Sequence, residues 1–545
     1  MSTRVKIIYY DLQKTEEMDP IKNHDLYTDR DKLDCCLKIV NRSHDAPVDQ
    51  VERLFRKEML LARKVAKNCD VRKACRSYIA LVGLVAAVCL YLLVANLTSP
   101  TLSLRSFRNK PDAKSRCFYA QKDEESPSIK ENLLKNITFH LDDGSIAYRN
   151  KWVGFRGMEQ VNCPMALAAP TLNRIYPRQI NRTFTHEIMK DAQNCSYFVN
   201  KYGFGRYPRP VQMEEDFPIA FVILFHKDLD QVLFLLRAIY RPHNAYCLTV
   251  DTKSSVKLHA ATRAIVRCLP NVFLSSKLED IVYGGLSRLM ADLNCFKDLM
   301  NHPVKWKYIL NTPGQQFPLR TNLELVQILK LFAGTNDILG TAEADWERKR
   351  HRYVHQYVTN VTTGQLEVRP TKRRHRPLPF GMKAVKCSAY GAFSRQFVHF
   401  VLTNQLAKDV LEWSKSIYSP DEMYWGVLNY NRVDPAPGGF SGKPNENPWL
   451  SSFSEWEASQ GGKLRCRSKF VRGICIFSPA DLPVLVKKVY LFANKFHITH
   501  HPAALHCLDQ WIYNNSVSLS FINETMYLDI LKKRWKRRNS ILQNL

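Results

Sequence analysis

The sequence lacks the glycine-rich signatures with which many nucleotide-binding folds hold phosphate groups. No GxGxxG follows its first strand-like run, and neither GxxxxGKS nor GxxxxGKT occurs anywhere in its 545 residues. These absences argue against a dinucleotide-binding fold and against a P-loop fold. They leave open a nucleotide that binds to a sheet of another kind.

Patterns of metal ligands are equally scarce. Ten cysteines follow residue 96, but they form no CxxC pair and lack the histidine spacing that zinc requires. In the same part of the chain a single Asp-x-Asp occurs, formed by Asp228 and Asp230 at the expected start of a helix. Acids at such a place more often serve as caps and as partners of the helix dipole, so a metal role for this pair is disfavoured.

One stretch is free of both charge and proline: residues 78–95, which read YIALVGLVAAVCLYLLVA. At about 1.5 Å per residue, a helix of this length just crosses a hydrocarbon core of roughly 30 Å. Because 77 residues precede the stretch and no clear cleavage site follows it, a membrane anchor is favoured over a cleaved signal peptide or a buried core helix. Between Arg53 and Arg76 there are nine Lys or Arg but only two acids, so the N-terminus should stay in the cytosol. We therefore expect a single-pass type II membrane protein.

Acidic residues are outnumbered, with 51 Asp and Glu against 79 Lys and Arg, which gives a formal net charge of +28. An excess of this size favours polyanionic partners, namely anionic lipid, sulfated glycans, phosphate-bearing substrates or nucleic acid. Translocation of the chain beyond residue 96 makes nucleic acid the least favoured of these, and we expect no nucleic-acid partner.

Changes in composition divide the chain into four expected segments. They are a cytoplasmic tail at 1–77, a signal-anchor transmembrane helix at 78–96, a stem with an N-terminal subdomain at 97–212, and a lumenal catalytic domain at 213–545. The last segment alternates helical patterns with apolar runs at 217–224, 246–250, 271–274 and 306–310. This alternation predicts an α/β fold with a mostly parallel sheet and helices on both faces. His226, Asp251 and Asn311 follow three of the predicted strands, at the sheet edge where ligands collect.

Several stretches of the catalytic segment resemble a known family. They are FVILFHKDLDQVLFLLRAIYRPHNAYCLTVDTK at 221–253, WKYILNTPGQQFPLRTNLE at 306–324, SAYGAFSRQFV at 388–398, YSPDEMYWG at 418–426, VRGICIF at 471–477 and LFANKF at 491–496. Together they resemble the core-2/I-branching β-1,6-N-acetylglucosaminyltransferase family, collinearly over roughly residues 195–512. The resemblance implies a GT-A-like nucleotide-sugar transferase fold, held by the signal anchor in the Golgi membrane.

The same resemblance implies a reaction. We expect an inverting glycosyltransferase that moves N-acetylglucosamine from UDP-GlcNAc, in β-1,6 linkage, to an O-glycan or a related glycoprotein acceptor. The UDP-sugar is a co-substrate, and no metal ion or other cofactor is expected.

Glu422 matches the family's catalytic base, which removes a proton from the acceptor hydroxyl. Pro420 fixes the backbone before it, and Tyr424 and Trp425 are expected to limit water access and to raise the pKa of its carboxyl group. Taken alone, an acidic pair behind a proline is also an ordinary helix start. Only the position within the family motif favours the base.

Further residues match donor-binding positions of the family. Arg472 and Lys495 correspond to the pair that clamps the diphosphate and supplies the positive charge that a metal would otherwise provide. His226, Asp251 and Arg288 correspond to contacts of the uridine. From the residues alone, Arg472 also fits a surface charge on a disulfide-closed loop, and Arg288 a charge on a helix face.

The acceptor side is less well defined, because the matching segment, GTAEADWERKRHRY at 340–353, departs from the family pattern. Arg348 matches a basic acceptor-binding position. Glu343 is the candidate for the acidic acceptor-binding position, and Asp345 and Glu347 compete with it.

The family's cysteine positions imply disulfides in the translocated part of the chain, as an oxidising lumen permits. The implied pairs are Cys163–Cys507, Cys195–Cys268, Cys247–Cys295 and Cys466–Cys475. Cys117 and Cys387 remain, and Cys117 in the stem is a candidate for a disulfide that links a homodimer. Asn-x-Ser/Thr sequons mark expected glycosylation sites at Asn136, Asn181, Asn194, Asn360, Asn514 and Asn523.

Two alternatives stay open. The first is another UDP-sugar transferase of the same superfamily, because peptide O-xylosyltransferases share its core. The second is a non-catalytic lumenal scaffold that binds glycans through its basic surface, including the run at 532–538, although a solvated tail explains that run equally simply. The joint presence of Glu422, Arg472 and Lys495 favours an enzyme, since a scaffold has no use for this arrangement of charges.

Overall fold

The computed structural model describes residues 158–168, 182–342, 348–457 and 466–532. The predicted cytoplasmic tail, the signal anchor at 78–96 and Cys117 lie outside these residues. Among the helices of the described ranges, none combines the length and the apolar composition that a membrane span requires.

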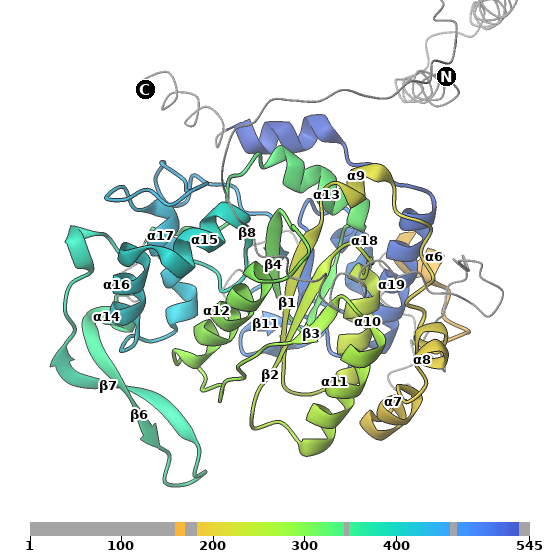
Figure 1. Cartoon of the computed structure of the whole chain (residues 1–545), viewed down its shortest axis with the longest axis horizontal. Helices are drawn as coiled ribbons and strands as arrows, with labels where there is room; N and C mark the ends of the chain where they lie inside the picture. Colours follow the sequence, from red (N-terminus) through yellow and green to blue (C-terminus); the bar gives the residue numbers. More distant parts are fainter. Residues whose placement is uncertain (1–157, 169–181, 343–347, 458–465, 533–545) are drawn as a thin grey trace, which may run out of the picture. The chain divides into compact units, whose positions relative to one another are not determined.

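A five-stranded sheet lies at the centre of the described chain (Figure 1). Its order is β3 (Val272–Leu274), β2 (Ala245–Val250), β1 (Ile219–Phe225), β4 (Tyr308–Pro313) and β8 (Ala392–Ser394). The first four strands are parallel to their neighbours, and β8 pairs with β4 in the antiparallel direction. The predicted mostly parallel sheet is therefore confirmed, and each apolar run named above contains or overlaps one of its strands.

Helices cover both faces of this sheet, as the alternating pattern predicts. Successive residues of β1 point to opposite faces, so that Phe221 packs into one core and Val222 into another. The first core contains α10 (Leu229–Ile239) and α11 (Val256–Cys268). The second contains α12 (Ser287–Met300) and α15 (Arg395–Thr403). Because both faces are buried, β1 is a continuous apolar run rather than an alternating one.

The remaining elements surround this centre. The other helices are α6 (Cys163–Ala168), α7 (Thr185–Asp191), α8 (Cys195–Tyr202), α9 (Gln212–Glu215), α13 (Asn322–Leu331), α14 (Lys349–Arg352), α16 (Gln405–Ser414), α17 (Tyr424–Tyr430), α18 (Leu482–Leu485) and α19 (Pro502–Val517). Smaller sheets are formed by β5 (Gln316–Pro318), β12 (Phe492–Asn494) and β9 (Ser452–Phe453), and by β10 (Phe470–Val471) with β11 (Ile474–Cys475). A long hairpin of β6 (Tyr353–Thr359) and β7 (Leu366–Arg374) projects from the body (Figure 1).

All four disulfides implied by the family resemblance are formed: Cys163–Cys507, Cys195–Cys268, Cys247–Cys295 and Cys466–Cys475. The first three tie α6 to α19, α8 to α11 and β2 to α12, and the last closes the loop around β10 and β11. Cys387 is a buried free thiol. Burial raises the pKa of Cys387 to about 12, so this thiol is inert.

The expected glycosylation sites differ in accessibility. The side chains of Asn194, Asn514 and Asn523 are exposed, whereas Asn360 is half-buried and donates a hydrogen bond to Glu367. Asn136 and Asn181 lie outside the described residues. Glycosylation at each sequon stays a prediction.

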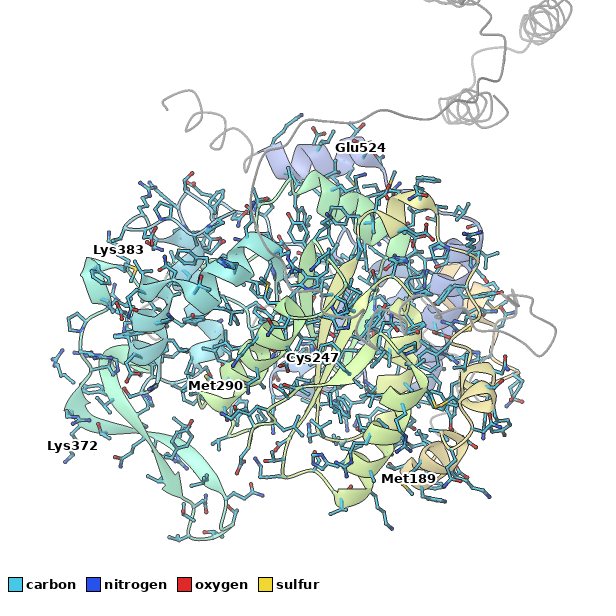
Figure 2. The ribbon with its side chains drawn as sticks, in the orientation of Figure 1. Met189, Cys247, Met290, Lys372, Lys383 and Glu524 are labelled. Carbon is cyan, nitrogen blue, oxygen red and sulfur yellow. A yellow bond between two sulfur atoms is a disulfide. The ribbon has the colours of Figure 1, made fainter. Side chains whose placement is uncertain are left out.

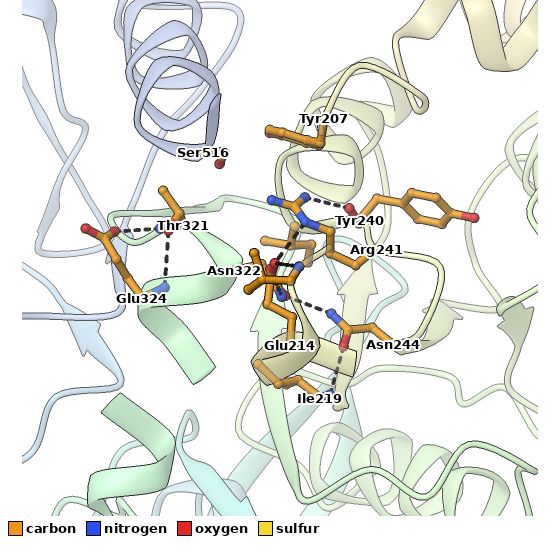
Figure 3. A network of polar contacts seen from close by, with 12 residues as sticks. Tyr207, Glu214, Ile219, Tyr240, Arg241, Asn244, Thr321, Asn322, Glu324 and Ser516 are labelled. Atoms are coloured by element: carbon orange, nitrogen blue, oxygen red, sulfur yellow. Dashed lines mark hydrogen bonds and ion pairs between the residues drawn. The ribbon is translucent and has the colours of Figure 1, made fainter. Parts of the chain in front are cut away.

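The amino-terminal edge of the central sheet is held by a buried polar network (Figure 3). Glu214 accepts a hydrogen bond of 2.7 Å from Asn322 and lies 3.6 Å from the guanidinium of Arg241. Asn244 donates to Asn322 at 2.8 Å and accepts from the backbone N–H of Ile219, the first residue of β1, at 2.8 Å. This network fixes the starts of β1 and β2 against α9 and α13.

Candidate active site

Polar residues collect at the opposite, carboxyl-terminal edge of the sheet. The backbone N–H of Asp251 donates to the carbonyl of Phe225 at 3.1 Å, which brings the ends of β1 and β2 together. His226 follows directly, and its carbonyl accepts the hydroxyl of Ser254 at 3.1 Å. Partial burial and the neighbouring charge of Lys227 lower the pKa of His226, so its imidazole is neutral at pH 7. The structure thus places two of the predicted uridine contacts side by side.

Asp251 shapes the turn that follows β2. Its Oδ1 accepts backbone N–H groups from Lys253 at 3.0 Å and from Ile281 at 3.4 Å, and it lies 3.3 Å from the ammonium of Lys253. These contacts orient the carboxylate at the strand end. Its predicted contact with the donor stays a prediction.

Two further cations, Lys495 and Arg472, lie at the same edge, near Lys227. Lys495 follows β12 and is only 7% exposed, yet it forms an ion pair with no carboxylate of the described ranges. Burial lowers the pKa of Lys495, and the positive charges of Arg472 and Lys227 lower it further. The three cations therefore share one region, although nothing in the described chain neutralises Lys495. The pairing of Arg472 with Lys495, predicted from the family positions, is thus found in space.

Arg472 sits at the tip of the β10–β11 hairpin in a backbone conformation that side chains rarely adopt. The φ angles of Arg472 and Gly473 are 53° and 71°, as a two-residue turn with both central φ values positive requires. For a residue with a side chain, this conformation costs about 1–2 kcal/mol. Its guanidinium lies 4.9 Å from the ring centre of Tyr283, and the disulfide Cys466–Cys475 closes the loop behind it. Arg472 is exposed, so its contact with Tyr283 fits a binding role and its place on the closed loop still fits a surface charge.

Glu422 lies in a short 3-10 turn, Pro420–Glu422, just before α17. Arg350 donates a hydrogen bond of 2.6 Å to its Oε2, and the ammonium of Lys386 lies 3.3 Å from the same oxygen. Within the described residues, no group hydrogen-bonds to Oε1. One carboxylate oxygen is therefore anchored by two cations.

The pKa of Glu422 does not shift in the direction expected from its neighbours in the sequence. Burial raises the pKa of the carboxyl group, but Lys386 and Arg350 together outweigh burial and hold this pKa below its ordinary value. The expectation that Tyr424 and Trp425 raise the pKa is therefore wrong. Both aromatic side chains point into the core of α12, α15 and α16, while the two cations face the carboxylate.

Asp421, the adjacent acid, has the opposite electrostatics. It is almost fully buried, and burial raises its pKa to about 6, with Arg288 opposing and Glu422 adding to the rise. The pKa values of these two neighbouring carboxyl groups therefore shift in opposite directions, so that Glu422 is the one that stays ionised across the physiological range.

Arg288 lies on the side of the site that faces these acids. Its guanidinium donates to Asp292 at 2.6 Å and lies 5.7 Å from the ring centre of Tyr390, and its charge acts on Asp421. No contact between Arg288 and either His226 or Asp251 is found among the described residues. The structure therefore does not bring this predicted uridine contact together with the other two.

A loop at 283–285 lies between Arg472 and the segment that carries Glu422. Tyr283 lies under Arg472, and the next residue, Gly284, has a φ of 73° and packs so closely on Tyr418 that a Cβ would lie 2.4 Å from the ring. The backbone N–H of Ser419 donates to Gly284 at 2.7 Å, and that of Tyr418 donates to Arg350 at 2.8 Å. The 283–285 loop therefore connects the segment that carries Glu422 with Arg472.

The structure describes only some of the predicted acceptor-binding residues. Arg348 is exposed and lies two residues before Arg350, immediately before α14. Glu343 and its competitors Asp345 and Glu347 lie outside the described residues. The roles of Arg348 and Glu343 stay predictions.

The two acids of the Asp-x-Asp contact an arginine, and whether the protein uses a metal stays a prediction. Arg182 binds both acids, at 2.9 Å to Asp228 and 2.6 Å to Asp230. Asp228 makes no capping hydrogen bond, so the acids hold Arg182 rather than cap the helix. In the described ranges, no group of three His, Cys, Asp or Glu side chains is arranged to hold a metal ion.

Sequence reasoning missed Arg350 and Lys386, the two partners of Glu422. Arg350 is one of five consecutive basic residues, and Lys386 stands two positions before the SAY motif. No local pattern distinguishes either residue, because both reach Glu422 through the packing of distant segments.

The sequence model of the core-2/I-branching enzyme family matches residues 219–486. A human N-acetyllactosaminide beta-1,6-N-acetylglucosaminyl-transferase is 42% identical over 301 residues, which cover 54% of this chain and 72% of the relative. The chain belongs to the core-2/I-branching enzyme family.

Other members of the family match over similar lengths. The mouse N-acetyllactosaminide beta-1,6-N-acetylglucosaminyl-transferase is 39% identical and matches 63% of this chain and 83% of its own. A mouse beta-1,3-galactosyl-O-glycosyl-glycoprotein beta-1,6-N-acetylglucosaminyltransferase 3 is 32% identical and matches 65% of this chain and 81% of its own. The chain is therefore a glycosyltransferase, as the sequence predicts.

Proposed function

We propose that this protein transfers N-acetylglucosamine from UDP-GlcNAc, in β-1,6 linkage and with inversion, to a galactose-containing O-glycan or a related acceptor. One arrangement carries the proposal. Glu422 is ionised and has one oxygen without a hydrogen bond from the described residues. Across the 283–285 loop lie Arg472 and Lys495, which form no ion pair with a described carboxylate. The printed names of the relatives supply the sugar and the linkage.

The proposed chemistry begins at Glu422. Its Oε1 accepts the proton of the acceptor hydroxyl while the hydroxyl oxygen forms a bond to the anomeric carbon of the donor sugar. The bond from that carbon to the diphosphate oxygen breaks on the opposite face, so the configuration inverts. Arg350 and Lys386 keep the carboxylate ionised and fix its direction through Oε2. They are positioning residues in this scheme.

The leaving group takes the negative charge that the reaction releases. Arg472 and Lys495 are proposed to bind the diphosphate, with Lys227 nearby, and so to stabilise the developing charge without a metal ion. The ion pairs that Arg182 makes with Asp228 and Asp230 support this part of the proposal, because they occupy the carboxylates that a metal would need.

The proposed setting is the Golgi lumen, with the chain anchored as a type II protein by residues 78–96. Disulfides throughout the described ranges support an oxidising compartment. A homodimer linked through Cys117 remains part of the proposal.

Release of UDP by the purified full chain tests the proposed function. UDP-GlcNAc and EDTA are supplied together with one acceptor at a time: lactosamine, a galactose-containing O-glycan disaccharide, a xyloside or a peptide. The proposal expects release with a galactose-containing acceptor, unchanged by EDTA and lost in Glu422→Gln. Release that needs Mn²⁺, or that occurs with the peptide alone, would contradict it.

A further inference from the structure

The base of the β6–β7 hairpin gathers basic residues from two separate parts of the chain. Residues 348–352 read RKRHR and residues 372–376 read KRRHR. The strand register places Tyr353 opposite Arg374, and the backbone N–H of His375 donates to the carbonyl of Arg352 at 3.1 Å. The two runs therefore lie side by side, and we call them the basic hairpin base.

Arg350 is paired with Glu422, but most of the exposed cations of this surface lack a partner among the described carboxylates. Its exposed cations without an ion pair to any described carboxylate are Lys349, Arg352, Lys372, Arg373, Arg374 and Arg376. The acid within the hairpin, Glu367, is already bound to Arg369 and Asn360. Lys372 lies at the outer edge of the hairpin, open to solvent (Figure 2). Cations gathered in one place repel one another, so folding alone gives no reason for this arrangement.

The basic hairpin base is continuous with the candidate active site. Arg350, within the first run, is the residue that holds Oε2 of Glu422. Farther along β6, the hydroxyl of Tyr357 accepts the backbone N–H of Leu286 at 3.0 Å, next to the loop that joins Glu422 to Arg472. Arg350 therefore links the basic hairpin base to Glu422.

We propose that the basic hairpin base binds an anionic substituent of the acceptor glycan, a sulfate ester or a sialic-acid carboxylate, while a neutral part of the same glycan reacts at Glu422. Four of the six uncompensated cations are arginines, whose planar forks match two oxygens of a sulfate or carboxylate at once. The inference rests on the proposed function, because it names the class of acceptor that the same site takes.

The test compares two triple variants of the full chain that lose the same charge. Lys372→Gln/Arg373→Gln/Arg374→Gln alters the basic hairpin base. Lys257→Gln/Arg263→Gln/Arg267→Gln alters exposed cations of α11, which makes no part of the site. KM is measured at low and high salt for three acceptors: a neutral lactosamine oligosaccharide, its sulfated form and its sialylated form. Direct binding of the fluorescently labelled sulfated and sialylated oligosaccharides is measured alongside.

We expect the hairpin variant to raise KM for an anionic acceptor by about tenfold, with kcat and the KM for the neutral acceptor unchanged, since each surface charge contributes modestly. The α11 variant should behave as wild type, and high salt should reduce the preference of the wild type. A rise in the KM of the hairpin variant for the sulfated form alone, or for the sialylated form alone, would identify which anionic group the surface binds.

Equal effects of the two variants, or an equal rise in KM for neutral and anionic acceptors, would overturn the inference. Binding of the protein to vesicles of anionic lipid but to neither anionic oligosaccharide would also overturn it. The direct binding assay separates this outcome from a failure of the proposed reaction. If no acceptor supports transfer, hairpin-dependent binding of an anionic oligosaccharide would still support the surface, and hairpin-independent binding would reject it.

Discussion

Glu214 at the amino-terminal edge of the central sheet and Lys495 at its carboxyl-terminal edge are buried to a similar extent, 4% and 7% exposed. Glu214 lies against Arg241 and Asn322, whereas Lys495 has no anionic partner in the described chain and lies near the like charges of Arg472 and Lys227. A buried charge is tolerated in a fold when it is paired. The amino-terminal edge follows this rule and the carboxyl-terminal edge breaks it, as a site built for an anionic ligand would.

The same substitution can be made at both edges, and the largest effect is expected at Glu422. Glu422→Gln should lower kcat by roughly 10²–10⁴-fold, because the amide cannot accept the proton of the acceptor hydroxyl. The free energy of unfolding should change by less than about 1 kcal/mol, since its ion pairs are partly solvated. Steady-state kinetics and urea unfolding check both values. Turnover near that of the wild type would remove Glu422 as the base.

Glu214→Gln should produce the reverse pattern. The free energy of unfolding should fall by about 1–3 kcal/mol, because a buried hydrogen-bonded partner of Arg241 and Asn322 is weakened. Turnover at temperatures where the variant is folded should equal that of the wild type. A selective loss of kcat without loss of stability would show that the amino-terminal edge is not merely structural.

The electrostatic setting of Glu422 can be tested by removing one of its cations. Lys386 helps to lower the pKa of Glu422, so Lys386→Met should raise this pKa and move the acidic limb of the kcat profile to higher pH. The sign follows because the base acts only when ionised, and a higher pKa leaves it protonated at a higher pH. Lys383→Met, at an exposed lysine nearby, is the matched control and should leave the profile in place. A shift toward lower pH would contradict the assignment.

The smallest expected effect is a gain in stability at the carboxyl-terminal edge. The pKa of Lys495 is lowered in the fold, so the folded state binds its proton less firmly than the unfolded state does. Stability should therefore rise with pH as this proton is lost, and Lys495→Gln should stabilise the free protein at neutral pH by about 1 kcal/mol. UDP should raise the thermal midpoint of the wild type more than that of the variant. A destabilised variant that still responds fully to UDP would reverse the comparison.

The fold was largely predictable from the sequence because its signals are local. Strand β1 is an uninterrupted apolar run and β2 is apolar apart from Thr249, and buried parallel strands have that pattern for a physical reason. The disulfides followed from the family's cysteine positions. The motif positions made Glu422, Arg472 and Lys495 candidates for the site, and the structure brings the last two together.

The electrostatics of the site were not predictable in the same way. The pKa of Glu422 depends on Arg350, which is 72 residues away in the sequence and reaches it through the base of the β6–β7 hairpin. Tyr424 and Trp425 are neighbours in the sequence, but the turn at Pro420–Glu422 and the helix α17 direct them into the core. The aromatic neighbours in the sequence predict a raised pKa for Glu422, whereas its contacts with Arg350 and Lys386 in the fold lower this pKa.

The central claim is that uncompensated protein cations, rather than a metal ion, hold the donor diphosphate. Calorimetric binding of UDP to the full chain in EDTA tests it directly, with Arg472→Gln/Lys495→Gln compared against the charge-matched Lys257→Gln/Arg263→Gln. The account predicts that the wild type and the control bind UDP equally and that the site variant loses roughly 100-fold in affinity, as expected for two charge-assisted contacts. Unchanged affinity in the site variant, or binding by the wild type only after Mn²⁺ is added, would contradict it.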